Sequence, residues 1–283
     1  MKIIRYALLL TLLIVLFWKF DFSGFLTSIK LVSPLAFIVL LILQIISQLL
    51  VNYQWCRIGR NMGQDHNFLK MLYINARGMI IESITPGVKI GGEVTRAILL
   101  KKELKYSSQE AATCVAIQKM VSFFSFFVIN LLVFSHLSTK IEIFQDIILK
   151  TIVYLFLIAV IGMLVFIFTG STFLEKKITN MVPKHKWTGV LKKFMMTLLS
   201  NIKILKSIKG EMYKQILLSL SIWTLFPIKM ILLISFFTNN LDWIFLTEVT
   251  FVSYMAGMIP LLPGGIGSFE ATMTSLLMII GIT

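Results

Sequence analysis

Charged residues inside apolar sequence are the feature of this chain that points to chemistry. Lys89, Glu93 and Arg96 are spaced i, i+4 and i+7, so they share one face of a helix. A charge at bilayer depth costs at least ~2.5 kcal/mol, so this face should line a cavity or pair internally. The free amides of a helix start add to the two cations in favouring an anion such as a phosphate diester. We therefore predict a cationic substrate-binding site that includes these three residues together with Lys119 and Glu270.

The same residues also have simpler structural explanations. Lys89 and Arg96 have long stems that could reach lipid headgroups, and Glu93 with Arg96 could form a purely structural ion pair. Both explanations stay open beside the functional one. Further charged or polar residues that could belong to a cavity in the membrane are Asn75, Arg77, Glu82, Lys229 and Glu248.

Two Pro-Gly motifs, each followed by a glutamate after five residues, interrupt the apolar sequence at residues 85–93 and 262–270. Proline removes a backbone donor and glycine frees the dihedral angles, so each motif should break a membrane helix. Matching interruptions in two halves of a chain indicate a transport site, although the glycines could instead permit tight helix packing. The residues assigned to the two broken-helix motifs are Thr85, Pro86, Gly87, Gly91, Gly92, Pro263, Gly264, Gly265, Gly267 and Ser268.

Composition indicates the fold class that must position these residues. Hydrophobic residues make up 57% of the 283, and the mean hydropathy is +0.88. We predict an all-α, polytopic integral membrane protein with about six to eight hydrophobic helical segments, each near the length that a bilayer requires. Cys56 and Cys114 provide neither a disulfide framework nor a zinc spacing, and the histidines are isolated, so we predict no metal and no cofactor.

Charge predicts the organisation of the chain and its orientation. We interpret residues 1–283 as one membrane domain with a first half (1–170), a basic loop (171–214) and a second half (215–283). The loop carries ten lysines against two glutamates, so the positive-inside rule places it in the cytoplasm of a multi-pass cell-membrane protein. The net charge of +14 therefore indicates contact with anionic lipid headgroups, and no nucleic-acid partner is expected.

The spacing of apolar runs predicts two kinds of helical element. Residues 68–84 and 88–104 are 17 residues each, about 25 Å as helix, which is short for a crossing. We predict a re-entrant hairpin here, with Thr85 as the N-cap of its second arm and Pro86 as the first helical residue. The segment 243–262 either enters from the opposite face, as in an inverted repeat, or crosses the membrane outright. Full crossings are predicted for residues 3–17, 31–51, 111–137, 147–169 and 216–237.

The two motifs resemble those of a known family. Thr-Pro-Gly-x-x-x-Gly-Gly-Glu-x-x-Arg-Ala at residues 85–97 and Leu-Pro-Gly-Gly-Ile-Gly-Ser-Phe-Glu-Ala at 262–271 are similar to motifs in the flippase-like membrane region of lysylphosphatidylglycerol synthases and their stand-alone relatives. The resemblance covers most of the chain. It implies a multi-span domain that moves, or helps to present, an anionic or modified lipid across the bilayer. The aminoacyl-transferase domain of the full synthases is not expected here, so the resemblance does not imply an enzyme.

The sequence departs from this family in two places. Relatives commonly carry a Glu-Arg pair and a nearby Asp in the segment after the first motif, where this chain has Gln118, Lys119 and Ser122. The positive charge is kept and the carboxylates are not. Relatives also continue past the second motif through further helices, whereas this sequence stops at Thr283, so we interpret it as a fragment or a shortened member.

Three functions follow from these observations as hypotheses. The first is a flippase or lipid transporter for an anionic or modified phospholipid or a polyprenyl-phosphate-linked lipid, with the headgroup between the two motifs. The second is a membrane glycosyltransferase with a polyprenyl-phosphate donor, which needs an outer carboxylate. The third is a non-transporting scaffold for a cytoplasmic lipid-modifying enzyme. Direct ATP drive is not expected, because the sequence contains no Walker A motif. The oligomeric state is left open.

Overall fold

The computed structural model describes residues 22–64, 67–85, 90–182, 185–238, 241–258 and 267–279. The first predicted crossing, residues 3–17, lies outside this part of the chain. So do six of the predicted motif and site residues, namely Pro86, Gly87, Lys89, Pro263, Gly264 and Gly265.

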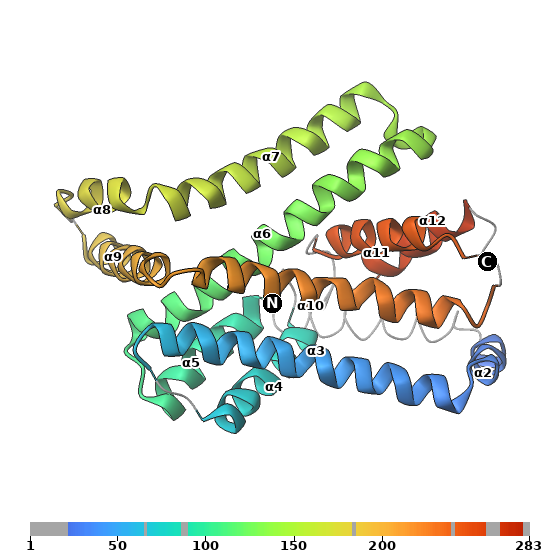
Figure 1. The fold of residues 1–283 in the computed structure, drawn as a ribbon, viewed down its shortest axis with the longest axis horizontal. Coiled ribbons are helices and arrows are strands. Elements are labelled where there is room, and N and C mark those ends of the chain that lie inside the picture. The colour runs from blue at the N-terminus through green and yellow to red at the C-terminus, as the bar shows by residue number, and fades with distance from the viewer. Residues whose placement is uncertain are drawn as a thin grey trace, which may run out of the picture.

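The described residues are helical, without strands, and four helices are long and apolar enough to cross a membrane (Figure 1). These are α3 (Pro34–Asn61), α6 (Ser108–Lys140), α7 (Ile147–Thr169) and α10 (Glu211–Ile234). Each agrees with a predicted crossing, and α7 has the predicted bounds. The prediction of an all-α polytopic membrane protein is confirmed.

Local sequence explains where these helices begin. The hydroxyl of Ser33 accepts a hydrogen bond from the Ala36 amide, and proline follows at the first helical position of α3. Ser107 and Glu110 form a reciprocal capping box at the start of α6. The carboxylate of Asp146 accepts from the first amides of α7. Each cap satisfies backbone donors that the helix itself leaves free.

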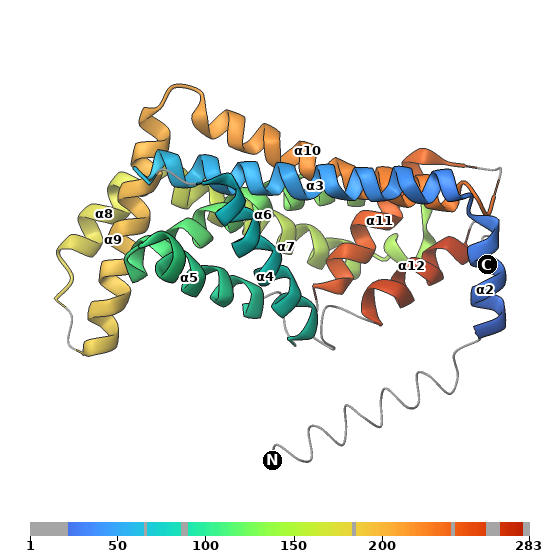
Figure 2. The ribbon, with the colours of Figure 1, turned by 90° about the horizontal axis from the view of Figure 1, so that it is seen from below.

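Two short helical hairpins pack against the long helices. The first consists of α4 (Phe68–Ile84) and α5 (Ile90–Leu104), and the second of α11 (Trp243–Gly257) and α12 (Ser268–Met278). In Figure 2 both lie on the same side of α3 and α10, but they open toward opposite ends of the molecule. Helix α11 ends before Leu262 and packs against α12, which favours a hairpin over one crossing through residues 243–262. Their depth in the membrane stays a prediction.

The prediction that Thr85 caps the second arm, with Pro86 as its first helical residue, depends on residues 86–89, which lie outside the described residues. Thr85 closes α4 as its C-cap, and its hydroxyl donates to the Ile81 carbonyl oxygen at 2.7 Å. The next described helix, α5, begins at Ile90. A residue before proline is pushed out of the helical region, and Thr85 is accordingly extended, with φ −100° and ψ 134°. Thr85 therefore ends the first arm of the hairpin.

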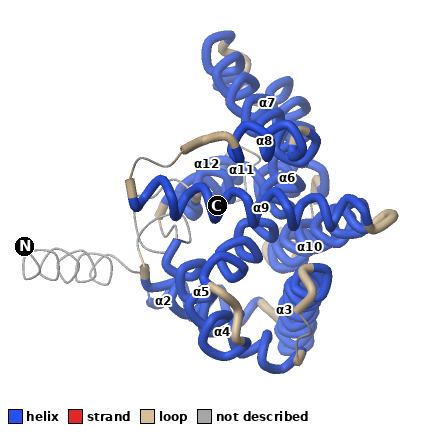
Figure 3. The backbone as a smooth tube through the Cα atoms, turned by 90° about the vertical axis from the view of Figure 1, so that its left-hand side faces the viewer, coloured by secondary structure: helices blue, strands red, loops and turns tan. Residues whose placement is uncertain are grey.

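The basic segment 171–214 is more ordered than a loop. It contains α8 (Ser171–Thr179) and α9 (Lys186–Ser207), and Leu198, Ile202 and Leu205 of α9 are buried against the core. Figure 3 views the molecule from this end. Shorter elements are α2 (Phe22–Leu31), which precedes α3, and a single 3-10 turn at Glu142–Phe144 between α6 and α7.

The described helices bury two large apolar cores and a small cluster of Ile231, Ile234 and Leu246 between α10 and α11. One joins α3, α4, α5, α6 and α9 around the fully buried Trp55, Met71 and Ile202. The other joins α6, α7, α10, α11 and α12 around Phe126 and Phe251. Each hairpin therefore belongs to a different core. Helix α6 passes through both, and its residues Gln118, Lys119 and Ser122 lie between them.

Candidate functional site

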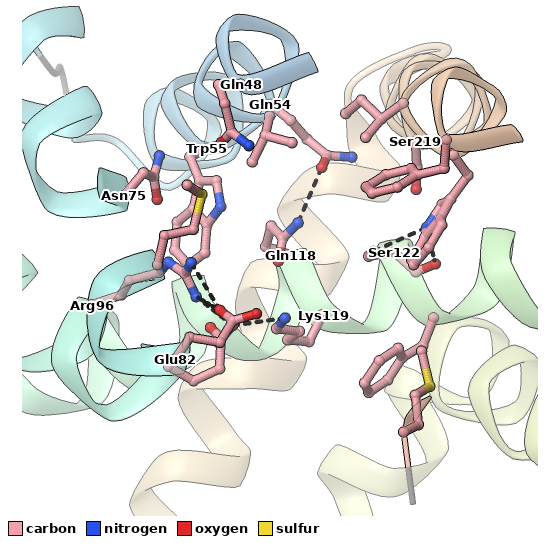
Figure 4. A pocket seen from close by; sticks show the side chains of 18 of the residues that line it. Gln48, Gln54, Trp55, Asn75, Glu82, Arg96, Gln118, Lys119, Ser122 and Ser219 are labelled. Carbon is pink, nitrogen blue, oxygen red and sulfur yellow. Dashed lines mark hydrogen bonds and ion pairs between the residues drawn. The ribbon is translucent and has the colours of Figure 1, made fainter. Parts of the chain in front are cut away.

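A polar pocket lies between the two cores, at mid-length of the long helices (Figure 4). Its volume is about 260 Å³. The lining comes from α3, α4, α5, α6 and α10, and Met258 at the end of α11 completes it. Both short hairpins thus contribute to one pocket.

An ion-pair cluster forms one wall of this pocket. The Arg96 guanidinium is 2.7 Å from Glu93 and 3.2 Å from Glu82, and the Lys119 ammonium is 2.7 Å from the same oxygen of Glu93. Figure 4 shows Arg96, Glu82 and Lys119 converging from three helices. Two carboxylates and two cations cancel in formal charge. The described part of the site is therefore neutral here, and the positive excess that the sequence predicts does not arise from these four residues.

Close packing of α4 on α5 makes this cluster possible. A Cβ atom at Gly78 would lie 2.6 Å from the Arg96 Nε, so Arg96 lies flat in a notch that glycine leaves open. A Cβ atom at Gly92 would lie 2.7 Å from the Gly78 carbonyl oxygen. Gly92 therefore permits tight packing of α5 on α4, as the alternative explanation of the motif glycines proposed. This packing brings Glu82 within reach of Arg96.

Several buried polar atoms of the pocket have no hydrogen-bond partner among the described residues. They include Glu93 Oε2, Arg96 Nε and Asn75 Oδ1. Such atoms are rare in folded proteins, because an unpaired buried polar group costs about 1–3 kcal/mol. The cluster therefore keeps hydrogen-bonding capacity that a polar ligand or water can use.

Amide side chains extend the polar lining along α3 and α6. Gln118 donates to Gln54 at 3.2 Å, and Gln54 donates to the Gln215 carbonyl oxygen at 3.4 Å. The indole of Trp223 donates to Ser122 at 3.1–3.2 Å. Gln118, Lys119 and Ser122, the three positions that differ from the motif expected from the resemblance, all line this pocket.

The structure brings together some of the predicted site residues and not others. Glu93, Arg96 and Lys119 meet in one cluster, whereas Lys89 lies outside the described residues. Glu270 is exposed and does not line the pocket; its carboxylate accepts the Gly267 amide at 2.7 Å and caps α12, which begins at Ser268.

Sequence reasoning missed the residues that α3 contributes. Gln44, Gln48 and Trp55 line the pocket at helical spacing within an otherwise apolar run. Their helical spacing in the sequence could have indicated that these three residues share one face of α3. Among the cavity candidates, Asn75 and Glu82 do line the pocket, whereas Arg77 is exposed and stacks over Tyr73. In the described part of the chain, no three His, Cys, Asp or Glu side chains are grouped so as to hold a metal ion.

The fold and the pocket define a polytopic helical membrane protein with a charged site between two short hairpins. The chain belongs to the family described as the lysylphosphatidylglycerol synthase TM region, which matches residues 2–283. It is 23% identical to a UPF0104 membrane protein of Methanothermobacter thermautotrophicus over 265 residues, 87% of this chain and 76% of the relative. It is 25% identical to a UPF0104 membrane protein of Methanocaldococcus jannaschii over 251 residues, 85% and 74% of the two chains. No solved structure matches it.

Proposed function

We propose that this protein moves a lipid between the leaflets of its membrane, with the polar pocket as the passage for the headgroup. The lipid is an anionic or modified phospholipid or a polyprenyl-phosphate-linked lipid. The observation that carries the proposal is the ion-pair cluster of Glu82, Glu93, Arg96 and Lys119 between the apolar cores, in which Arg96 is buried and Glu93 Oε2 and Arg96 Nε have no hydrogen-bond partner among the described residues.

The depth of the cluster supports this proposal. Lys119 lies 11 residues after Ser108 and 21 before Lys140, about 17 Å and 32 Å along α6 at 1.5 Å per residue. Charges so far inside a candidate span mark a substrate or ion pathway in membrane proteins. A lipid headgroup needs such a polar station because the hydrocarbon core provides none.

The ion pairs suggest how the pocket accepts a phosphate. A phosphate diester that reaches Arg96 and Lys119 takes over the role of Glu93, which already contacts both cations. Charge-assisted bonds of this kind are among the strongest that side chains form. The Glu93 carboxylate then loses both cations, so the entering headgroup must offer it a donor.

The proposal is tested by reconstitution in liposomes that carry fluorescent lipid analogues, scored by the fraction of label that a membrane-impermeant quencher reaches. The wild type should move label between leaflets. Arg96→Gln should slow exchange about tenfold or more, since a hydrogen bond to a charged group is worth about 1.5–3 kcal/mol. The matched control is Arg77→Gln, because Arg77 is an exposed arginine on the neighbouring helix outside the pocket.

Two results would contradict the proposal. The first is a wild type that moves none of the tested lipids, which would favour the scaffold hypothesis. The second is equal exchange in Arg96→Gln and the wild type, which would remove the ion-pair cluster from the pathway.

A further inference from the structure

Lys229 is a second cationic position, away from the ion-pair cluster. Its ammonium donates to Gln44 Oε1 at 2.7 Å and to the Ser47 hydroxyl at 3.2 Å, and it lies 4.6 Å from the centre of the Phe226 ring. Gln44 and Phe226 line the polar pocket. Lys229 therefore lies at the edge of this pocket, between α3 and α10.

The charge of Lys229 is not balanced. None of the ion pairs between described residues involves Lys229, and its neighbours are an amide, a hydroxyl and an aromatic ring. The four charges of the ion-pair cluster cancel, so Lys229 supplies the net positive charge of the described pocket region. A cation in a candidate span normally pairs with an anion.

An apolar pocket of about 610 Å³ lies further along the same two helices. It is lined by residues of α2, α3 and α10 and by their flanking positions, among them Ile38 and Leu233. On α10, Phe226, Lys229 and Leu233 follow one another at about one helical turn each. On α3, Ile38 precedes Gln44 by six residues, about 9 Å. The order along both helices is therefore apolar pocket, Lys229, polar pocket.

We infer that α3 and α10 form a binding site for a phosphodiester lipid, in which Lys229 binds the phosphate. An acyl chain occupies the apolar pocket beside α2, and the headgroup extends into the polar pocket toward Gln48 and Gln54. This order of apolar, cationic and polar surface matches the order of groups in a phospholipid. The inference deepens the proposed function and rests on it for the transport role, but binding is measured separately.

The amide groups add to the preference for such a ligand. Gln48 lines the polar pocket on the same side of α3 as Gln44, one turn away. Amides offer both donors and acceptors, so they suit a hydroxyl-bearing headgroup that carries no further charge. One unbalanced cation then corresponds to one phosphate charge.

The test is retention of lipid by the purified protein in non-ionic detergent, counted by native mass spectrometry. The probes are phosphatidylglycerol and a diacylglycerol with the same acyl chains but no phosphate. The wild type should retain phosphatidylglycerol about tenfold better than diacylglycerol, and Lys229→Gln should lose most of this difference. Lys229→Arg should restore it. The matched control is Lys150→Gln, because Lys150 lies on α7 and lines neither pocket.

A chain-length series tests the apolar pocket by the same readout. Leu233→Trp should fill this pocket and lower retention of both long-chain probes while leaving dihexanoyl phosphatidylglycerol unchanged. Retention of that short-chain lipid also shows that the variant is folded. Equal lowering of short-chain and long-chain lipid would overturn the acyl-chain position.

Failure of this inference is distinguishable from failure of the proposed function. Equal phosphatidylglycerol retention by the wild type and Lys229→Gln would overturn the Lys229 site, and so would equal retention of the two probes by the wild type. Neither result contradicts leaflet exchange by way of Arg96. Conversely, retention that depends on Lys229 without any leaflet exchange in liposomes would contradict only the transport proposal.

Discussion

At the scale of single residues, a two-point salt bridge joins Arg57 on α3 to Glu211 on α10. Two guanidinium nitrogens of Arg57 each lie 2.6 Å from a different carboxylate oxygen of Glu211, and Gln215 donates to one of these oxygens at 2.9 Å. The Glu211 side chain is only 3% exposed. Planar, two-point pairing of this kind fixes geometry as well as adding energy.

Arg57→Gln should therefore destabilise the folded protein by about 3 kcal/mol, because it leaves the buried Glu211 carboxylate without a counter-charge. The measurement is the midpoint of thermal unfolding in detergent micelles, followed by circular dichroism. Arg60→Gln is the control, since Arg60 is exposed on the same helix. If both variants unfold at the same temperature, the bridge contributes no stability.

Residue spacing predicted part of the candidate site. Glu93 and Arg96 share a helical face whatever the tertiary structure, and Lys119 carries a charge in a candidate span, so all three could be chosen from the sequence. The contact of Arg96 with Glu82 could not be derived in this way. It depends on how closely α4 approaches α5, and helical periodicity gives no distance between two helices.

At the scale of elements, the close approach of α4 to α5 depends on glycine. Gly92→Ala places a Cβ atom 2.7 Å from the Gly78 carbonyl oxygen, which is backbone and cannot rotate away. The two helices must separate, and overpacking of this kind typically costs about 1–3 kcal/mol. The variant should unfold at lower temperature and should also slow lipid exchange, because Arg96 and Glu82 move apart.

Gly162→Ala is the matched control for this prediction. Gly162 lies on α7 with no other atom within 4 Å of an added Cβ, so alanine should be neutral or stabilise α7 by up to about 1 kcal/mol. Unfolding and exchange are measured for both variants side by side. A Gly92→Ala protein as stable and as active as Gly162→Ala would show that the two hairpin arms tolerate a wider separation.

Element bounds were predictable where an apolar run ends at a clear capping residue. The apolar runs predicted 147–169 and 68–84, and the structure shows that Asp146 caps the start of α7 and Asn67 the start of α4. The helices of segment 171–214 were harder to derive. Lysines dominate the charge of that segment and favour a loop, while the buried stripe Leu198, Ile202 and Leu205 is too short to show which helix it packs against.

At the scale of the whole molecule, the two hairpins open toward opposite ends and each belongs to its own apolar core (Figure 2). The polar pocket lies where the two cores adjoin, lined by Glu82 and Glu93 from one hairpin and by Met258 beside the other. Packed cores move as units, so a small tilt of one core against the other would change access to the pocket first. For the proposed lipid transport, this arrangement would allow alternating access about a fixed site.

The opposed hairpins predict a pattern of chemical labelling. Lys193→Cys on α9 and Lys102→Cys at the end of α5 should both face the cytoplasm, whereas Trp243→Cys at the start of α11 should face the other side. All three positions are exposed, and the native Cys56 and Cys114 are buried, so background labelling should be low. In intact cells of an expression host, a membrane-impermeant maleimide should label only Trp243→Cys, and permeabilised cells should label all three. Labelling of Lys102→Cys together with Trp243→Cys in intact cells would contradict hairpins that enter from opposite faces, because the ends of α5 and α11 would then share one side of the membrane.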